Sequence, residues 1–235
     1  MIVNQVLAQN DTLGKKTAND KNSLAYYIVP SSLITYGIIT RFSCGLQNLD
    51  KNIDAKIKQN VHRRYKFDDY IQYAPYLAIY GLDWCRVKAK HNFWDRNLVL
   101  GTSIIFTSVL VQGTKYFTRI ERPDGSNKHS FPSGHTATAF LGAHILFKEY
   151  KERSIWIGVA GYGLACTTAT MRMVNRKHWL SDVITGAGVG IICAELGYLM
   201  LPVWHKLFKI KPKDKNLTIT PIITNNLGIG GILIF

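Results

Sequence analysis

Residues 97–113, NLVLGTSIIFTSVLVQG, form a run of 17 amino acids without one charged side chain. Five further apolar runs lie in this chain of 235 residues, at 24–40, 73–82, 134–147, 154–171 and 183–204. A membrane-spanning helix needs about 20 residues, so the runs at 97–113, 154–171 and 183–204 are long enough, whereas those at 73–82 and 134–147 need flanking residues. The pattern predicts an all-α fold, an integral membrane bundle of about six helices.

The number of true spans depends on the first run. Pro30 stands in the middle of residues 24–40, where a proline interrupts helical hydrogen bonding. The opening MIVNQVLAQ resembles the end of a secretory signal, and an N-terminus outside the cell would leave residues 24–40 at the interface and five spans in the membrane. We therefore divide the chain into an N-terminal segment 1–23, a membrane domain 24–205 and a basic tail 206–235.

Two segments outside the apolar runs have patterns of their own. Residues 49–65 are basic and amphipathic, which predicts a helix on the bilayer surface. Residues 217–235 alternate apolar and polar side chains around Asn225 and Asn226, which suggests a small hairpin.

The composition limits the class of protein. The 29 Lys and Arg residues exceed the 15 Asp and Glu residues, and the net charge of +14 predicts attraction to phosphate, anionic lipid or nucleic acid. A hydrophobic share of 47% excludes wholesale disorder. The four cysteines form no C-x-x-C pair, so we expect neither a disulfide framework nor a zinc site.

Polar residues with chemical potential gather in three blocks at the ends of apolar runs. The blocks are Lys115-x6-Arg122-Pro123, Pro132-Ser133-Gly134-His135 and Arg172-x5-His178-x3-Asp182. If the helices at 134–147 and 154–171 form a hairpin, all three blocks lie on one face of the membrane.

The third block contains half of a catalytic dyad. His178 and Asp182 are four residues apart, so on a helix they would share a face and the carboxylate could accept the proton on Nδ1. The Nε2 atom then remains as a nucleophile or base. The other histidines and the buried-span acids Asp83 and Glu195 are expected to be surface, packing or polar-partner residues.

The remaining block residues suit an anion. His135 follows the start of a helix whose first backbone N–H groups, around Ser133 and Gly134, have no partner within the helix and attract phosphate. Three cations, Lys115, Arg122 and Arg172, add charge, and the two guanidinium groups can bind phosphoryl oxygens with two hydrogen bonds each. This chemistry needs no metal and no cofactor.

These three blocks resemble the signature of the type 2 phosphatidic acid phosphatase superfamily, which includes vanadium haloperoxidases and bacterial acid phosphatases. The resemblance implies that His178 attacks phosphorus, that Asp182 orients it and that His135 protonates the leaving oxygen and then activates water. It implies phosphate binding by Lys115, Arg122, Ser133, Gly134 and Arg172. Met171 stands where the family usually has serine before the arginine.

We therefore expect a metal-independent membrane phosphatase that hydrolyses a lipid phosphate or diphosphate through a phosphohistidine, at the periplasmic face of a bacterial inner membrane. Membrane and lipid are the expected partners, nucleic acid is not, and the oligomeric state stays open. A soluble secreted acid phosphatase or a vanadate-dependent haloperoxidase would share the same pocket. A catalytically silent lipid-binding membrane protein is the alternative of another class.

Overall fold

Helices make up the main body of the computed structural model, which describes residues 24, 26–61, 65, 67–208, 217–223 and 227–233. A first helix covers residues 26–42. The helices that follow are α2 (Cys44–Asn60), α3 (Asp68–Ile71), α4 (Ala74–Trp84), α5 (Phe93–Thr118), α6 (Gly134–Tyr150), α7 (Ile155–Val174) and α8 (Leu180–Leu207). The backbone of β1 (Leu217–Ile223) pairs antiparallel with that of β2 (Leu227–Leu233), in the segment whose alternation suggests a hairpin.

The described residues of the six apolar runs lie in helices, as predicted, apart from Tyr73 and Ser154, which are the N-caps of α4 and α7. The amphipathic segment is helical with different bounds. It covers Cys44–Asn60 instead of 49–65. The side chain of Ser43 caps the helix by accepting a hydrogen bond from the Leu46 N–H, and Val61 is extended at the other end. Residues 1–9, with their resemblance to a signal, lie outside the described residues.

Two described helices, α5 and α8, are long and apolar enough to cross a membrane. The third run that is predicted to be long enough forms α7. This helix has 20 residues, but it is not one of the two described helices that are both long and apolar enough to cross a membrane. On α5 the side chains of Ile105, Val109 and Phe117 are exposed, each by more than half of its surface. Exposed apolar patches of this kind indicate contact with lipid or another partner.

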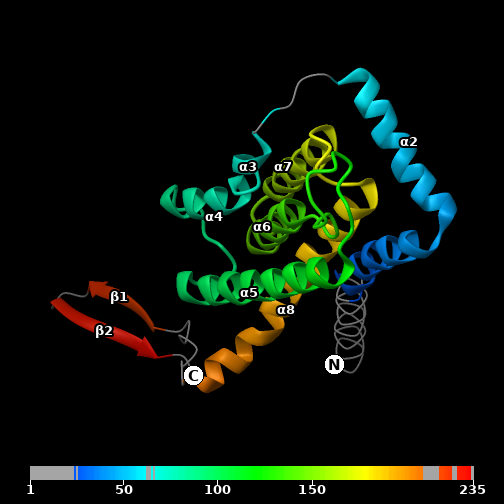
Figure 1. The fold of residues 1–235 in the computed structure, drawn as a ribbon. Helices are drawn as coiled ribbons and strands as arrows, with labels where there is room; N and C mark the ends of the chain where they lie inside the picture. Colours follow the sequence, from blue (N-terminus) through cyan, green and yellow to red (C-terminus); the bar gives the residue numbers. More distant parts are fainter. Residues whose placement is uncertain are drawn as a thin grey trace, which may run out of the picture. The chain divides into compact units, whose positions relative to one another are not determined.

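The interior is built on small side chains where α6 and α7 pack side by side (Figure 1). Ala139, Ala143 and Ala165 form the buried centre of this contact, with Phe140 and Tyr162 against them. Helices α4 and α5 also pack on α6, and the short α3 contacts both α6 and α7. This packing places residues 68–71, which form α3, at the start of α6.

Glycines on α8 let the backbone of that helix approach the backbone of α6 closely. A Cβ atom on Gly190 would lie 2.2 Å from the carbonyl oxygen of Ala137, and one on Gly186 would lie 2.6 Å from that of Ser133. Side chains larger than hydrogen therefore have no room at these positions. The close approach holds the first turns of α6 and α8 together, and with them the second and third sequence blocks.

Replacing Gly190 by Ala should destabilise the protein by about 1–3 kcal/mol, because overpacking forces backbone shifts. Thermal unfolding in detergent would show a lower Tm. Gly163→Ala is the matched control, since a Cβ atom there meets nothing within 4 Å. An equal Tm for the two variants would contradict the close packing of α6 and α8.

Candidate active site

Residues from all three sequence blocks line one cavity of about 400 Å³. The lining residues predicted for the site are Lys115, Arg122, Gly134, His135 and His178. The three other predicted residues, Ser133, Arg172 and Asp182, are buried and are not among the lining residues. The cavity therefore lies between the end of α5, the start of α6 and the connection from α7 to α8.

His178 and Asp182 lie close together and are almost fully buried. His178 precedes α8, and Asp182 belongs to its first turn. The distance from His178 Nδ1 to Asp182 Oδ2 is 3.6 Å, just beyond hydrogen-bond range, so the carboxylate stands beside the imidazole without a hydrogen bond to it. Such contacts in ligand-free sites are often long and shorten when substrate binds.

Other contacts fix the carboxylate of Asp182. Its Oδ2 atom accepts hydrogen bonds from Ser130 Oγ at 2.5 Å and from the Trp179 backbone N–H at 2.9 Å. Its carbonyl oxygen accepts a hydrogen bond from the Ser133 N–H at 3.0 Å. One aspartate therefore joins the loop before α6, the start of α6 and the start of α8.

Burial lowers the pKa of His178 to about 4, with the positive charges of Arg172 and Lys115 acting in the same direction and Asp182 opposing them. The imidazole is therefore neutral at physiological pH, and a neutral imidazole has a free lone pair on one ring nitrogen. A nitrogen with this lone pair can act as a nucleophile or a base.

The start of α6 presents backbone to the cavity. Ser133 is the N-cap, and its buried hydroxyl accepts a hydrogen bond from the Thr136 N–H. This side chain therefore caps the helix, while Gly134 and His135 in the first turn line the cavity. The unpaired N–H groups of a helix start attract anions.

Arg172 is held by acidic residues that the sequence interpretation did not single out. Its Nη1 atom donates to Asp68 Oδ2 at 2.6 Å and lies 3.4 Å from Asp69 Oδ1. Both Arg172 and Asp68 are buried, and Asn175 donates a further hydrogen bond to Asp68 at 3.0 Å. The guanidinium group thus has a fixed orientation.

Asp69 joins this cluster to the second histidine. Its Oδ1 atom lies 3.0 Å from His135 Nε2, and the same oxygen approaches Arg172. The Asp69 side chain is 49% exposed and lines the cavity, so it can move when an anion enters. A carboxylate oxygen therefore lies between a cation and an imidazole.

The loop with Arg122 is fixed to the α7–α8 connection. Lys177 Nζ donates to Asp124 at 2.7 Å, and Arg176 donates to the carbonyl oxygen of Pro123 at 2.8 Å. Burial, together with the charge of Arg172, lowers the pKa of Arg122. Crowded cations in a partly dehydrated cavity favour an anionic ligand.

Only weak signals in the sequence could have found the additional residues. Asp68 and Asp69 are an acidic pair directly after the basic stretch 62–66, and they lie some hundred residues from the arginine they contact. Ser130 is an ordinary loop serine in sequence. Within the described part of the chain, no group of three or more His, Cys, Asp or Glu side chains is arranged to hold a metal ion.

One protein family matches part of the chain. Residues 96–206, a little under half of the 235 residues, match the PAP2 superfamily, the phosphatidic acid phosphatase type 2 group that the three sequence blocks resemble. The helices of the described residues confirm the predicted all-α fold class.

Two curated relatives are both lipid A 1-phosphatases. The one from Porphyromonas gingivalis is 37% identical over 184 residues, which are 76% of this chain and 38% of that protein. The one from Helicobacter pylori is 32% identical over 77 residues, which are 32% of this chain and 38% of that protein. The chain thus spans about two fifths of the length of the curated relatives it matches.

Two solved structures are similar at lower identity. LpxE from Aquifex aeolicus has a TM-score of 0.46 and 23% identity, with 65% of this chain and 94% of that chain covered. The transmembrane PAP2 type phosphatidylglycerolphosphate phosphatase from Bacillus subtilis has a TM-score of 0.49 and 21% identity, with 79% of this chain and 98% of that chain covered.

The buried pair of Arg172 and Asp68 should be essential for stability. Asp68→Asn leaves the buried guanidinium without its principal counter-charge, and breaking such a pair costs about 3–5 kcal/mol. Thermal unfolding should show a large fall in Tm. Asp69→Asn is the control, because its side chain is half exposed and should cost under about 1 kcal/mol. Equal losses in the two variants would contradict this account.

The low pKa of His178 should appear as pH-dependent stability. The unfolded chain takes up a proton on this residue near its ordinary pKa of about 6.5, whereas the folded protein does so only at about 4. Stability should therefore fall as the pH drops from 6.5 to 4, by about 3 kcal/mol, with no such loss above 6.5. Tm measured against pH should fall less steeply in His178→Asn, and parallel curves would refute the assignment.

Proposed function

We propose that this protein is a metal-independent membrane phosphatase that removes a phosphate group from a lipid phosphate or diphosphate. The observation that carries the proposal is a neutral, buried imidazole beside a carboxylate, facing a cavity lined by Lys115 and Arg122. Preorganised positive groups stabilise the charge that develops on phosphoryl oxygens in the transition state.

The first step of the proposed reaction is nucleophilic. Nε2 of His178 attacks phosphorus, a nitrogen–phosphorus bond forms, and the bond to the leaving oxygen breaks. Asp182 stabilises the positive charge on the imidazole, and its 3.6 Å contact with Nδ1 would shorten in that state. Lys115, Arg122, Arg172 and the start of α6, with Ser133 and Gly134, hold the phosphoryl oxygens.

His135 is proposed to move the protons. It gives a proton to the leaving oxygen, and it then removes one from the water that hydrolyses the phosphohistidine and releases phosphate. Because its Nε2 atom lies 3.0 Å from Asp69 Oδ1, the entering phosphate has to displace that carboxylate. The exposure of Asp69 allows this movement.

Lipid A 1-phosphate is the substrate we place first, since both curated relatives are lipid A 1-phosphatases. Undecaprenyl diphosphate and phosphatidylglycerol phosphate are the other candidates. We further propose that the site faces the periplasm from a bacterial inner membrane.

The test is phosphate release from purified lipid phosphates in detergent. His178→Ala should abolish turnover, and Asp182→Asn should lower kcat by about 10²–10⁴-fold, because an unoriented imidazole is a poor nucleophile. EDTA should not inhibit. His129→Ala, in the loop before α6 and outside the cavity lining, is the matched control with unchanged rates. Wild-type turnover by His178→Ala would overturn the proposal.

A further inference from the structure

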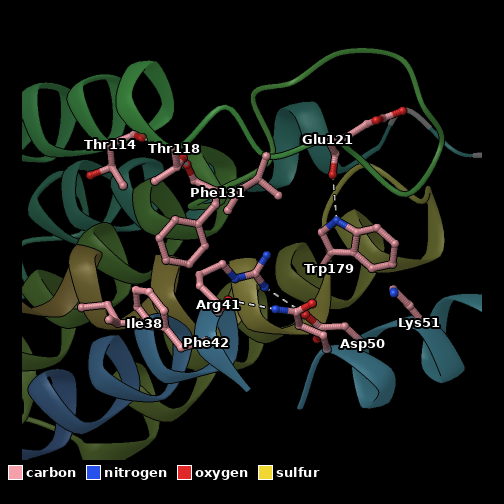
Figure 2. A pocket seen from close by; sticks show the side chains of 12 residues that line it. Ile38, Arg41, Phe42, Asp50, Lys51, Thr114, Thr118, Glu121, Phe131 and Trp179 are labelled. Carbon is pink, nitrogen blue, oxygen red and sulfur yellow. Dashed lines mark hydrogen bonds and ion pairs between the residues drawn. The ribbon is translucent and has the colours of Figure 1, made fainter. Parts of the chain in front are cut away.

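A second cavity, of about 660 Å³, lies next to the candidate active site (Figure 2). It is enclosed by the end of the first helix, by α2, by the last turns of α5, by the loop that follows and by Trp179. Neither the three sequence blocks nor the proposed reaction uses it. Its volume is within the range of ligand-binding pockets, about 300–1,000 Å³.

The two cavities are separated by no more than the thickness of the chain. In three places, neighbouring residues of the chain line different cavities. Thr114, Glu121 and Trp179 line the second cavity, and their neighbours Lys115, Arg122 and His178 line the candidate active site. On a helix, consecutive side chains point about 100° apart, which explains the division at α5. The two linings therefore lie on the two sides of the same three short segments.

The lining of the second cavity differs in chemistry from that of the first. Figure 2 shows the aromatic and aliphatic side chains of Ile38, Phe42, Phe131 and Trp179 around it. Its charged lining residues number two cations, Arg41 and Lys51, and two anions, Asp50 and Glu121, so their formal charges cancel. An anion has no net attraction to such a lining, whereas an apolar chain gains by leaving water.

Two of the four charged lining residues, Arg41 and Asp50, are held by contacts within the protein. Arg41 pairs with Asp50 at 3.0 Å, bonds to the hydroxyl of Ser181 and lies 5.3 Å from the centre of the Phe131 ring. Ser181 also donates to Asp50 through both its backbone and its hydroxyl. These contacts fix the Arg41–Asp50 pair, and the apolar side chains beside it are open to a ligand.

We propose that this second cavity receives an acyl chain of the lipid whose phosphate group enters the candidate active site. The proposal rests on the proposed function, which supplies the phosphate end of the ligand. It assigns the apolar end to the neutral cavity and the anionic end to the cationic one. Chain length would then be read at the second cavity, and the phosphate at the first.

Substitutions that fill the second cavity test the proposal. Ile38→Trp and Thr114→Trp should raise KM for a long-chain phosphatidic acid at least tenfold, while hydrolysis of a water-soluble phosphate monoester changes less than twofold. The soluble substrate also reports correct folding. Val109→Trp, on the exposed face of α5 and outside both linings, is the control that changes neither rate.

Losses of equal size on the two substrates, or an unchanged KM for the lipid in both cavity variants, would overturn the proposal. A short-chain phosphatidic acid should show an intermediate loss, since less of the chain enters the cavity. A tenfold loss with a soluble sugar phosphate would instead assign the cavity to a head group, and this result too would overturn the proposal.

A binding measurement separates this proposal from the proposed function. Bromine on an acyl chain quenches the fluorescence of a tryptophan that it contacts, and Trp179 is one of five tryptophans in the chain. Brominated phosphatidic acid added to His178→Ala should quench a share of emission that disappears in His178→Ala with Trp179→Phe, and unbrominated lipid should compete.

The activity assay and the quenching measurement can fail independently, and each failure refutes a different proposal. Quenching of Trp179 without any phosphate release by the wild-type protein would refute the phosphatase and retain the acyl-chain cavity. Phosphate release with no quenching attributable to Trp179 would refute the cavity and retain the phosphatase.

Discussion

The carboxylate of Asp182 is the group on which the arrangement of the site depends. It is buried, and it accepts hydrogen bonds from Ser130 and from the backbone of Trp179 while facing His178. Its own carbonyl oxygen binds the start of α6. A buried charge is tolerated only where it is paired and hydrogen-bonded, so the elements that meet at Asp182 have little freedom to separate. The glycines of α8 act toward the same end, because they let the backbones of α6 and α8 approach closely enough for these bonds to form.

The site also contains a cluster of cations, and their positive charge is only partly neutralised by neighbouring carboxylates. Asp68 neutralises Arg172 from the buried side, whereas the half-exposed Asp69 lies on the cavity side. The buried partner orients the guanidinium group permanently, and the exposed one can be exchanged for another anion. This division explains how one arginine can be held in place and still bind a ligand, since a fully satisfied guanidinium would gain nothing from phosphate.

The sequence predicts the helices where the signal is local, and it predicts three blocks of residues that the fold brings to one cavity. Composition and short spacing are visible directly in the sequence. They are enough to recognise the uncharged run at 97–113 and the three blocks around Lys115, His135 and His178. The bounds of α2 were wrong because Ser43, one residue among many serines, caps it earlier than the amphipathic pattern begins. Asp68 and the second cavity depend on contacts between segments distant in sequence, for which one sequence gives no sign.

The neutral and the cationic cavity together address a difficulty of any reaction at a lipid head group. A phosphate ester with acyl chains has an anionic end that binds best near positive charge and an apolar end that binds best away from charged groups. These two ends are only a few bonds apart. A single mixed pocket would desolvate cations beside the apolar chain at considerable cost. In this protein the chain backbone at Lys115, Arg122 and His178 separates the two environments, and the side chains of Thr114, Glu121 and Trp179 face the other way. Because the two linings share the same three short segments, a shift of these segments would move both sets of side chains, and under the proposed function it would couple binding of the apolar chain to the position of the proposed catalytic groups.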